Sequence, residues 1–252
     1  ASAANPADIP ADAPVLSGEA QAAATAAAEQ AENVRRERQL HRQNLAAQQR
    51  SLVVCEQRFG EAIRTYKKTV DQAVTNARAA REHAHSLVSG FVGEMMGDGE
   101  SAIRLLSEGM GDRASMHPVN VAIVSLLLGK ATGMNEAELV DLGMAAFLHD
   151  MGKTRLPDRV RWLQENFSPA EYKAYQEHVV LGVQMGREMG LGEPVLKAIA
   201  QHHEMMDASG FPARLKGESL TRAAKILALV NRYENLCNPS RPAAAITPHE
   251  AL

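Results

Sequence analysis

Residues 135–153 read NEAELVDLGMAAFLHDMGK, and this stretch decides the fold class. Asn135 and Glu138 have the spacing of a capping box, which begins a helix. Along that helix, His149 follows Leu142 by seven residues, so its imidazole falls on the stripe that should face the core. The stretch therefore predicts a buried helix that ends in an inward-facing polar pair, His-Asp.

The remainder of the chain supports an all-α fold. Ser168 and Glu171 repeat the capping-box spacing, and no strand-like alternation of useful length appears. Aromatic residues make up only 4% of the 252 residues, whereas alanine, leucine and methionine are abundant. That composition favours helices over a β-sandwich or a barrel.

Further histidines interrupt apolar helix faces in the same way. Five of the nine histidines fall on inward stripes of four predicted helices: His117, His149, His178, His202 and His203. A single inward histidine is usually a hydrogen-bonded core residue, but five beside Asp150 are hard to pair without a cation. Six ligands exceed the needs of one tetrahedral ion. We therefore expect two divalent transition metals bridged by Asp150, with iron or manganese first and zinc or nickel as alternatives.

Charge and cysteine content exclude several classes of protein. The formal net charge of −3 provides no broad basic surface, so duplex nucleic acid is not expected as a partner. Cys55 and Cys237 lie far apart and form no CxxC pair, which argues against a disulfide framework and a thiolate zinc site. No apolar run reaches the roughly 18 residues that a membrane span requires. We expect a cytoplasmic protein.

The first 97 residues divide into two predicted segments. Residues 1–18 contain three prolines among small residues and are predicted to be a disordered linker. Residues 19–97 are predicted to be helical, with a heptad seam. The seam residues alternate at four and three: Phe59, Ile63, Tyr66, Val70, Ala73, Ala77, Ala80, Ala84, Leu87 and Phe91.

Two interpretations of the seam stay open. It could join two chains in a homodimer through residues 59–91, as a coiled coil does, or a long helix could lay the stripe on its own globular domain. Glycines at 97, 99, 109 and 111 interrupt the pattern, and a second domain is predicted over residues 98–252.

That second domain resembles a known family. Its ordered motifs are His117, then HDMGK from His149 to Lys153, then His178, then HHE from His202, then DASGFP at 207–212. This set is similar to the HD-GYP family of cyclic di-GMP phosphodiesterases, over about residues 100–252.

The resemblance implies an HD-type helical bundle that hydrolyses a phosphodiester bond of cyclic di-GMP, or of a related cyclic dinucleotide, with a metal-activated water. Asp150 and Lys153 would be catalytic, and Asp150 would bridge the two ions. The implied metal ligands are His117, His149, Asp150, His178, His202, His203 and Asn231. The implied substrate-binding residues are Lys153, Gly210, Phe211, Pro212 and Arg241.

Several positions depart from the family pattern. Ala208 and Phe211 stand where glycine and tyrosine are usual, and Ala208 matters only if the turn requires a positive φ. Asn231 replaces an aspartate ligand, and its neutral amide should hold a dication less tightly. Glu234, one turn later on nearly the same face, could substitute for it. Arg113 stands where some members carry an extra glutamate ligand, which favours two ions over three.

These departures keep other functions open. A catalytically impaired domain could serve as a cyclic dinucleotide sensor or as a protein-interaction module, an alternative that Asn231 motivates. An HD phosphohydrolase with a different substrate and a helical scaffold with structural histidines are the remaining alternatives.

Overall fold

The computed structural model describes residues 18–97, 113–163, 166–238, 245–247 and 249–251. The chain forms two compact units, Ala1–Ser51 and Leu52–Leu252. Across the described residues the structure is helical and without strands, which confirms the all-α prediction; a single isolated bridge joins Asp207 and Lys216. The predicted linker lies outside the described residues except for Gly18, which is helical, and most of the predicted boundary at 97–112 also lies outside them.

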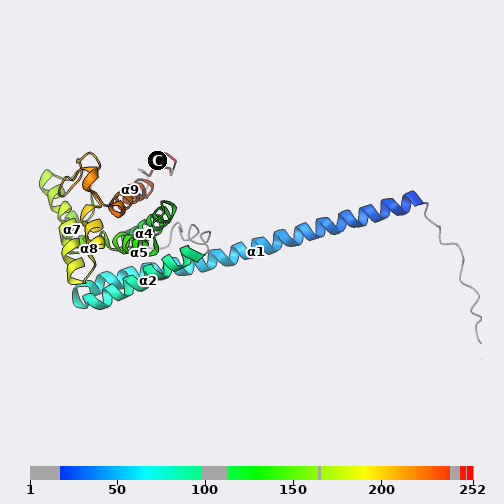
Figure 1. Ribbon diagram of the computed structural model, residues 1–252, viewed down its shortest axis with the longest axis horizontal. Helices are drawn as coiled ribbons and strands as arrows, with labels where there is room; N and C mark the ends of the chain where they lie inside the picture. Colours follow the sequence, from blue (N-terminus) through cyan, green and yellow to red (C-terminus); the bar gives the residue numbers. More distant parts are fainter. Residues whose placement is uncertain (1–17, 98–112, 164–165, 239–244, 248, 252) are drawn as a thin grey trace, which may run out of the picture. The chain divides into compact units, whose positions relative to one another are not determined.

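The helices follow one another along the chain in the order shown in Figure 1. The α-helices are α1 (Gly18–Thr75), α2 (Ala77–Gly97), α4 (Arg113–Ala131), α5 (Glu136–Leu148), α6 (Asp158–Arg161), α7 (Pro169–Glu188), α8 (Glu193–Gln201) and α9 (Arg222–Cys237). Two short 3₁₀ helices are η1 (Met151–Arg155) and η2 (Gly217–Ser219). No described helix has the length and apolarity that crossing a bilayer requires.

The last part of α1 and the whole of α2 form an antiparallel hairpin. Arg58 forms an ion pair with Glu94, and Lys68 Nζ lies 3.1 Å from His83 Nε2, so both pairs are nearly symmetric about residue 76. Asn76 separates the helices, and its side chain accepts a hydrogen bond from the backbone of Ala79 (3.1 Å). Asparagine is a preferred helix cap, so the chain turns here instead of continuing as one straight helix.

The heptad stripe is buried within the chain's own fold. Phe59, Ala73, Ala80 and Ala84 are at most 2% exposed and belong to the common hydrophobic core. Tyr66 packs edge-on against Phe147 of α5, with ring centroids 5.3 Å apart. Of the two interpretations of the seam, packing on its own globular domain is therefore confirmed.

Helices α4, α5, α7, α8 and α9 gather into a bundle (Figure 1). Both predicted capping boxes are present, at Asn135 before α5 and at Ser168 before α7. Each satisfies backbone donors that a helix start would otherwise leave without partners. These caps fix where the two helices that carry His149 and His178 begin.

Gly152 allows η1 and α7 to pack closely. A Cβ atom at this position would lie 2.0 Å from the carbonyl oxygen of His178 and 2.4 Å from the backbone nitrogen of Gly182. Only a residue without a side chain lets η1 meet α7 so closely. This contact brings Asp150, two residues earlier in the chain, next to His178.

Candidate metal centre

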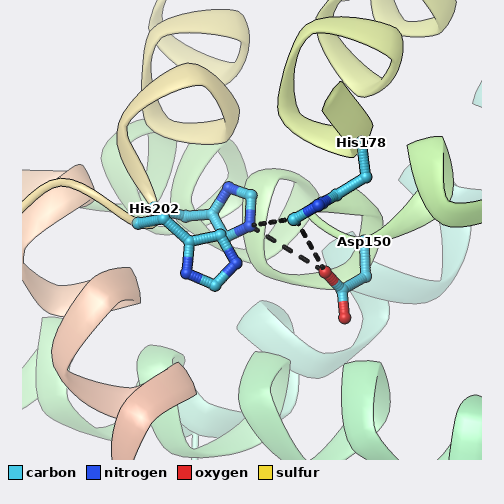
Figure 2. A group of neighbouring side chains, drawn as sticks. Asp150, His178 and His202 are labelled. Carbon is cyan, nitrogen blue, oxygen red and sulfur yellow. Dashed lines mark hydrogen bonds and ion pairs between the residues drawn. The ribbon is translucent and has the colours of Figure 1, made fainter. Parts of the chain in front are cut away.

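Two groups of potential ligands meet at Asp150. His117 and His149 form one group with it, and His178, His202 and His203 form the other. Within each group the ligand atoms all lie within 4.8 Å of one another. Figure 2 shows His178 and His202 pointing toward the Asp150 carboxylate. The five inward histidines thus converge as the sequence predicted.

Each residue comes from the end or the inner face of a different helix. His117 lies in α4 and His178 in α7, whereas His149 and His202 directly follow the last residues of α5 and α8. His117, His149, His178 and His202 are at most 6% exposed. Because four elements contribute, the site forms only when the bundle packs.

A repeated local contact orients three of the imidazoles. Nδ1 of His149, His178 and His202 lies 2.6–2.7 Å from the carbonyl oxygen three residues earlier, in Ala146, Tyr175 and Ile199 respectively. A carbonyl can only accept, so Nδ1 carries the proton and donates it. The Nε2 lone pair of each ring is left pointing into the shared space, as in metal-ligating histidines.

The inward nitrogens face one another closely. His117 Nε2 lies 3.3 Å from His149 Nε2, and His178 Nε2 lies 3.4 Å from His202 Nε2. Burial lowers the pKa of His149 to about 4 and those of His178 and His202 to about 3, so these rings are neutral at ordinary pH. Two donors bound 2.0–2.1 Å from one ion lie about 3.0–3.4 Å apart. The spacing therefore fits a shared cation.

Asp150 divides its two oxygens between the two groups. Oδ2 lies 3.5 Å from His149 Nε2 and 3.7 Å from His117 Nε2. Oδ1 lies 3.7 Å from His178 Nε2 and 3.9 Å from His202 Nε2, and it has no hydrogen-bond partner although it is buried. A buried carboxylate oxygen without a donor fits a position beside a cation. The arrangement is consistent with a binuclear site that Asp150 bridges.

Lys153 gives this carboxylate a permanent cationic neighbour. Its Nζ donates to Asp150 Oδ2 at 2.6 Å, and its side chain is 13% exposed. Burial opposes charge on both groups, yet their mutual attraction holds the pKa of Asp150 well below its usual range and raises the pKa of Lys153. Asp150 is thus ionised and Lys153 protonated at neutral pH.

Glu234 lies at the site, one turn after Asn231 as the sequence indicated, but its contact with His117 was not predicted. It is buried, and its Oε2 accepts a hydrogen bond from Nδ1 of His117, while Oε1 accepts from Asn120 (3.2 Å) and Asn238 (3.3 Å). It lies outside both ligand groups. A carboxylate on the outer nitrogen fixes the tautomer of an imidazole and makes its inner nitrogen more basic.

Asn231 is buried at 3% exposure on α9 and lines the cavity above the site. Its Oδ1 accepts a hydrogen bond from Asn235 Nδ2 at 2.8 Å. An amide oxygen has a second lone pair, so this bond restricts ligation without preventing it. Its assignment as a ligand stays a prediction.

One buried carboxylate helps to hold the loop over the site, residues 204–217. Glu204 is 1% exposed and accepts hydrogen bonds from the backbone nitrogens of Ala213 (2.6 Å) and Leu215 (2.9 Å). A Cβ on Gly210 would come within 2.4–2.5 Å of the backbone of residues 203–205. The sequence motif included Glu204, but nothing in its pattern indicated this role.

Two positions that depart from the family pattern, Ala208 and Phe211, lie in the same loop. Ala208 has a φ of +65°, so this turn does require the left-handed region that glycine adopts without penalty. The ring of Phe211 stacks on His203 with centroids 4.5 Å apart. Phe211 therefore packs directly against a candidate ligand, and the missing hydroxyl does not remove that contact.

A cavity of about 710 Å³ opens above the ligand groups. Its lining includes His117, Asp150, Lys153 and Phe211, and it also includes Tyr66 and Lys67 from α1. This volume lies within the range of small-molecule sites. The sequence did not predict that α1 lines the cavity, and Arg241, predicted to bind substrate, lies outside the described residues.

Comparison with known proteins agrees with this geometry. A model of the HD domain family matches residues 102–252. The cyclic di-GMP phosphodiesterase of Thermotoga maritima is 27% identical over 136 residues, which are 52% of this chain and 36% of that protein. The response regulator RpfG of Xanthomonas campestris pv. campestris, also a cyclic di-GMP phosphodiesterase, is 31% identical over 47% of this chain and 32% of its own length.

The relatives differ in the substrate that their names state. The 3'3'-cGAMP-specific phosphodiesterase 2 of Vibrio cholerae serotype O1 is 32% identical over 48% of this chain and 23% of its length. The matches therefore span between 23% and 36% of these three relatives. Among solved structures, Bd1817, a HDG"Y"P protein from Bdellovibrio bacteriovorus, has the same fold, with a TM-score of 0.68, 18% identity and coverage of 80% of this chain and 64% of that one.

Proposed function

The chain belongs to the HD domain family and is related to the HD-GYP cyclic di-GMP phosphodiesterases, and on this basis we propose that it hydrolyses the phosphodiester bonds of cyclic di-GMP at a binuclear metal site. One observation carries the proposal. Two pairs of imidazoles turn their Nε2 atoms inward, and each pair faces a different oxygen of one ionised carboxylate.

The roles of individual residues form part of the proposal. His117 and His149 would hold one ion, and His178, His202 and His203 the other, with Asp150 between them. Asn231 would add a weak seventh ligand, because its amide is neutral and already bound to Asn235. The nitrogen and carboxylate donor set suits iron or manganese, with zinc or nickel as alternatives.

When bound, the ions acidify the attacking water and neutralise charge on the phosphate. In the reaction, the water oxygen bonds to phosphorus, the phosphorus bond to the leaving ribose oxygen breaks, and that oxygen takes up a proton. Lys153 keeps its proton and lines the cavity next to Asp150, so its ammonium can bind a phosphate oxygen. Glu234 holds His117 in position from behind.

The loop over the site would form one wall of the substrate pocket. Gly210 allows the loop to press against residues 203–205, and Phe211 lies on His203. Pro212 follows in the same turn. We propose that these three residues contact the substrate, together with Arg241 from the segment after α9.

An impaired domain that binds a cyclic dinucleotide as a sensor, or that serves as a protein-interaction module, is the second candidate. Asn231 favours it, because loss of one negative ligand weakens ion binding, and Ala208 adds strain to the loop. Both features reduce the expected rate, and neither removes the paired imidazoles. We therefore place hydrolysis first.

The decisive experiment combines metal analysis with turnover. Protein loaded with Mn(II) or Fe(II) without oxygen should contain two ions per chain and convert cyclic di-GMP to a linear dinucleotide or to GMP. The variant Asp150→Asn should retain the fold, lose both ions and turn over less than about 1% as fast. Metal-loaded wild-type protein that binds cyclic di-GMP without forming product would identify the sensor instead.

The same assay distinguishes among related substrates. Relatives include enzymes whose names specify cyclic di-GMP and others whose names specify 3'3'-cGAMP. We propose cyclic di-GMP as the better substrate and expect a higher kcat/KM for it in a direct comparison. A preference for 3'3'-cGAMP would keep the mechanism and change the substrate.

Other expectations from the sequence remain proposals. These are the division into segments 1–18, 19–97 and 98–252, a cytoplasmic location, and a homodimer through residues 59–91. The seam residues are already buried within the chain, so a dimer would have to use other surfaces of that region. Sedimentation of the intact chain tests this, and a monomer at all concentrations would contradict it.

A further inference from the structure

Half of the aromatic side chains in this chain line one cavity. The sequence contains one tryptophan, four tyrosines and five phenylalanines. Five of these ten line the cavity above the ligand groups: Tyr66, Trp162, Tyr172, Tyr175 and Phe211. Since aromatic residues are rare in this protein, this concentration requires an explanation.

Packing explains some of these rings but not all. Tyr66 and Tyr175 are 7% and 5% exposed, and they pack on Phe147 and His178. Trp162, by contrast, is 45% exposed and Tyr172 is 40% exposed. Exposed rings contribute little to the stability of the core, so these two have area available for a ligand.

Trp162 lies near the end of the cavity where the substrate phosphate is proposed to bind. Its ring centroid lies 5.6 Å from Lys153 Nζ, the cation proposed to contact the substrate phosphate. In a nucleotide, one ribose separates the phosphate from the base. A phosphate at Lys153 therefore brings its base within reach of the indole ring.

We propose that Trp162 and Tyr172 form a stacking subsite for the purine bases of the nucleotide substrate. This inference rests on the proposed function, and it assigns base recognition to residues outside the metal-binding motifs. Trp162 follows α6 and Tyr172 lies in the first turn of α7, so they offer two separate rings to a ligand that has two bases. Base stacking on an aromatic side chain contributes about 1–3 kcal/mol per base.

The two rings differ in their surroundings. Tyr172 lies against Phe211, with centroids 6.2 Å apart, and this contact continues the aromatic wall toward His203. Trp162 lies next to Lys153, a cation that a nucleotide phosphate would share. We therefore expect Trp162 to contribute more to nucleotide binding than Tyr172.

Trp162 is the chain's one tryptophan and so reports on its own environment. GMP should quench its fluorescence when the indole is excited at the red edge of its band, where guanine scarcely absorbs. Ribose 5-phosphate, which has the same phosphate but no base, should change the emission little at equal concentration. Equal effects of the two ligands, or no effect of GMP, would overturn the proposal.

Matched substitutions distinguish stacking on a planar ring from contact with any apolar side chain of similar size. Trp162→Leu should raise the KM for cyclic di-GMP about tenfold and change kcat less than about threefold. Trp162→Phe keeps a ring and should raise KM less than about threefold. Tyr172→Leu should have an intermediate effect. Leu229→Ala, at a 60% exposed position outside the cavity lining, should leave KM unchanged.

The outcomes distinguish this inference from the proposed function. Turnover of cyclic di-GMP with the same KM in wild type and Trp162→Leu would keep the enzyme and overturn the stacking subsite. Quenching by GMP without any turnover would keep the subsite and overturn hydrolysis. A third outcome would make the exposed indole a protein contact instead. In that case GMP would not quench the wild type, Tyr172→Leu would not change the response to nucleotide, and Trp162→Leu would lose only the binding of a protein partner.

Discussion

The floor of the cavity and the loop over it, residues 204–217, are held by different kinds of contact. The floor is formed by the candidate ligands His117, His149, Asp150, His178, His202 and His203. On the floor, each of three imidazoles donates to a carbonyl three residues earlier in its own chain segment. The loop is held by Glu204, which binds backbone groups nine and eleven residues later, and by backbone hydrogen bonds such as those from Phe211 to His203 and from Gly217 to Met206 (both 3.1 Å). Neither part tolerates an added atom at its closely packed glycine, Gly152 on the floor or Gly210 in the loop, but the loop also contains Ala208 at a φ of +65°.

This difference indicates where each part of the site can change. Floor geometry follows from helix ends and close packing, so its disruption should affect folding and metal binding together. The loop is not part of the helix packing and already contains strain at Ala208, so the effect of relieving that strain should be smaller. Four predictions test the comparison, in order of decreasing expected effect.

Gly152→Ala should have the largest effect. The added Cβ would overlap the backbone of His178 and Gly182, so one element must move, and we expect the free energy of unfolding to fall by about 3 kcal/mol or more. Urea denaturation measures this, and metal content should fall in parallel. Gly90→Ala is the matched control, because nothing lies within 4 Å of its Cβ in α2; it should stabilise by about 0.5–1 kcal/mol. Similar effects of both would contradict the comparison.

Acid should destabilise the metal-free protein because the buried histidines of the floor resist protonation. The pKa of His149 is about 4, and those of His178 and His202 are about 3, against 6.5 for an ordinary histidine. Below pH 6.5 the unfolded chain therefore binds protons that the folded chain does not. The free energy of unfolding should fall as pH decreases from about 6.5 to about 3 and stay level above that range.

A substitution locates the source of this pH dependence. His178→Gln removes one of the three imidazoles with a lowered pKa named above and should make the fall with pH less steep, as urea denaturation at several pH values would show. The exposed His41 offers a control, and His41→Gln should leave the slope unchanged. If the free energy of unfolding of His178→Gln depends on pH as steeply as that of the wild type, the floor histidines do not cause the pH dependence.

Glu234→Gln should have a moderate effect confined to one ion. The amide accepts less strongly from Nδ1 of His117, so affinity for the ion bound by His117 and His149 should fall about 10–100-fold. Competition with a chelator should then show one weakened ion and one unchanged ion. Glu218→Gln, at an exposed position, should alter neither. Equal weakening of both ions would assign Glu234 a general structural role.

Ala208→Gly should produce the smallest change, in the favourable direction. Glycine relieves the left-handed strain, although it also makes the unfolded chain more flexible, so the net gain should be about 0.5 kcal/mol. The same substitution at Ala213, which does not have a positive φ, should destabilise by a similar amount. Thermal unfolding of the two variants compares them, and a shift in the same direction for both would rule out strain at Ala208.

Particular residues show how far the sequence predicts the site. His149 and His202 follow the last residues of their helices, and the same i−3 carbonyl contact turns each imidazole inward. Helical periodicity is local, so inward faces could be identified without knowledge of the fold. The seam pattern did not indicate the break at Asn76, because a one-residue interruption does not alter the spacing of apolar residues on either side.

The sequence by itself determined the helices, their caps and the inward faces of the five histidines, because these depend on residues within one or two turns of each other. Only the tertiary structure decided that Glu234 would bind His117, 117 residues away, and that α1 would line the cavity. Such contacts depend on how whole helices pack, and packing is set by the combined shape of many side chains. The candidate ligands could thus be identified from local sequence, whereas the contacts that support them form only in the assembled bundle.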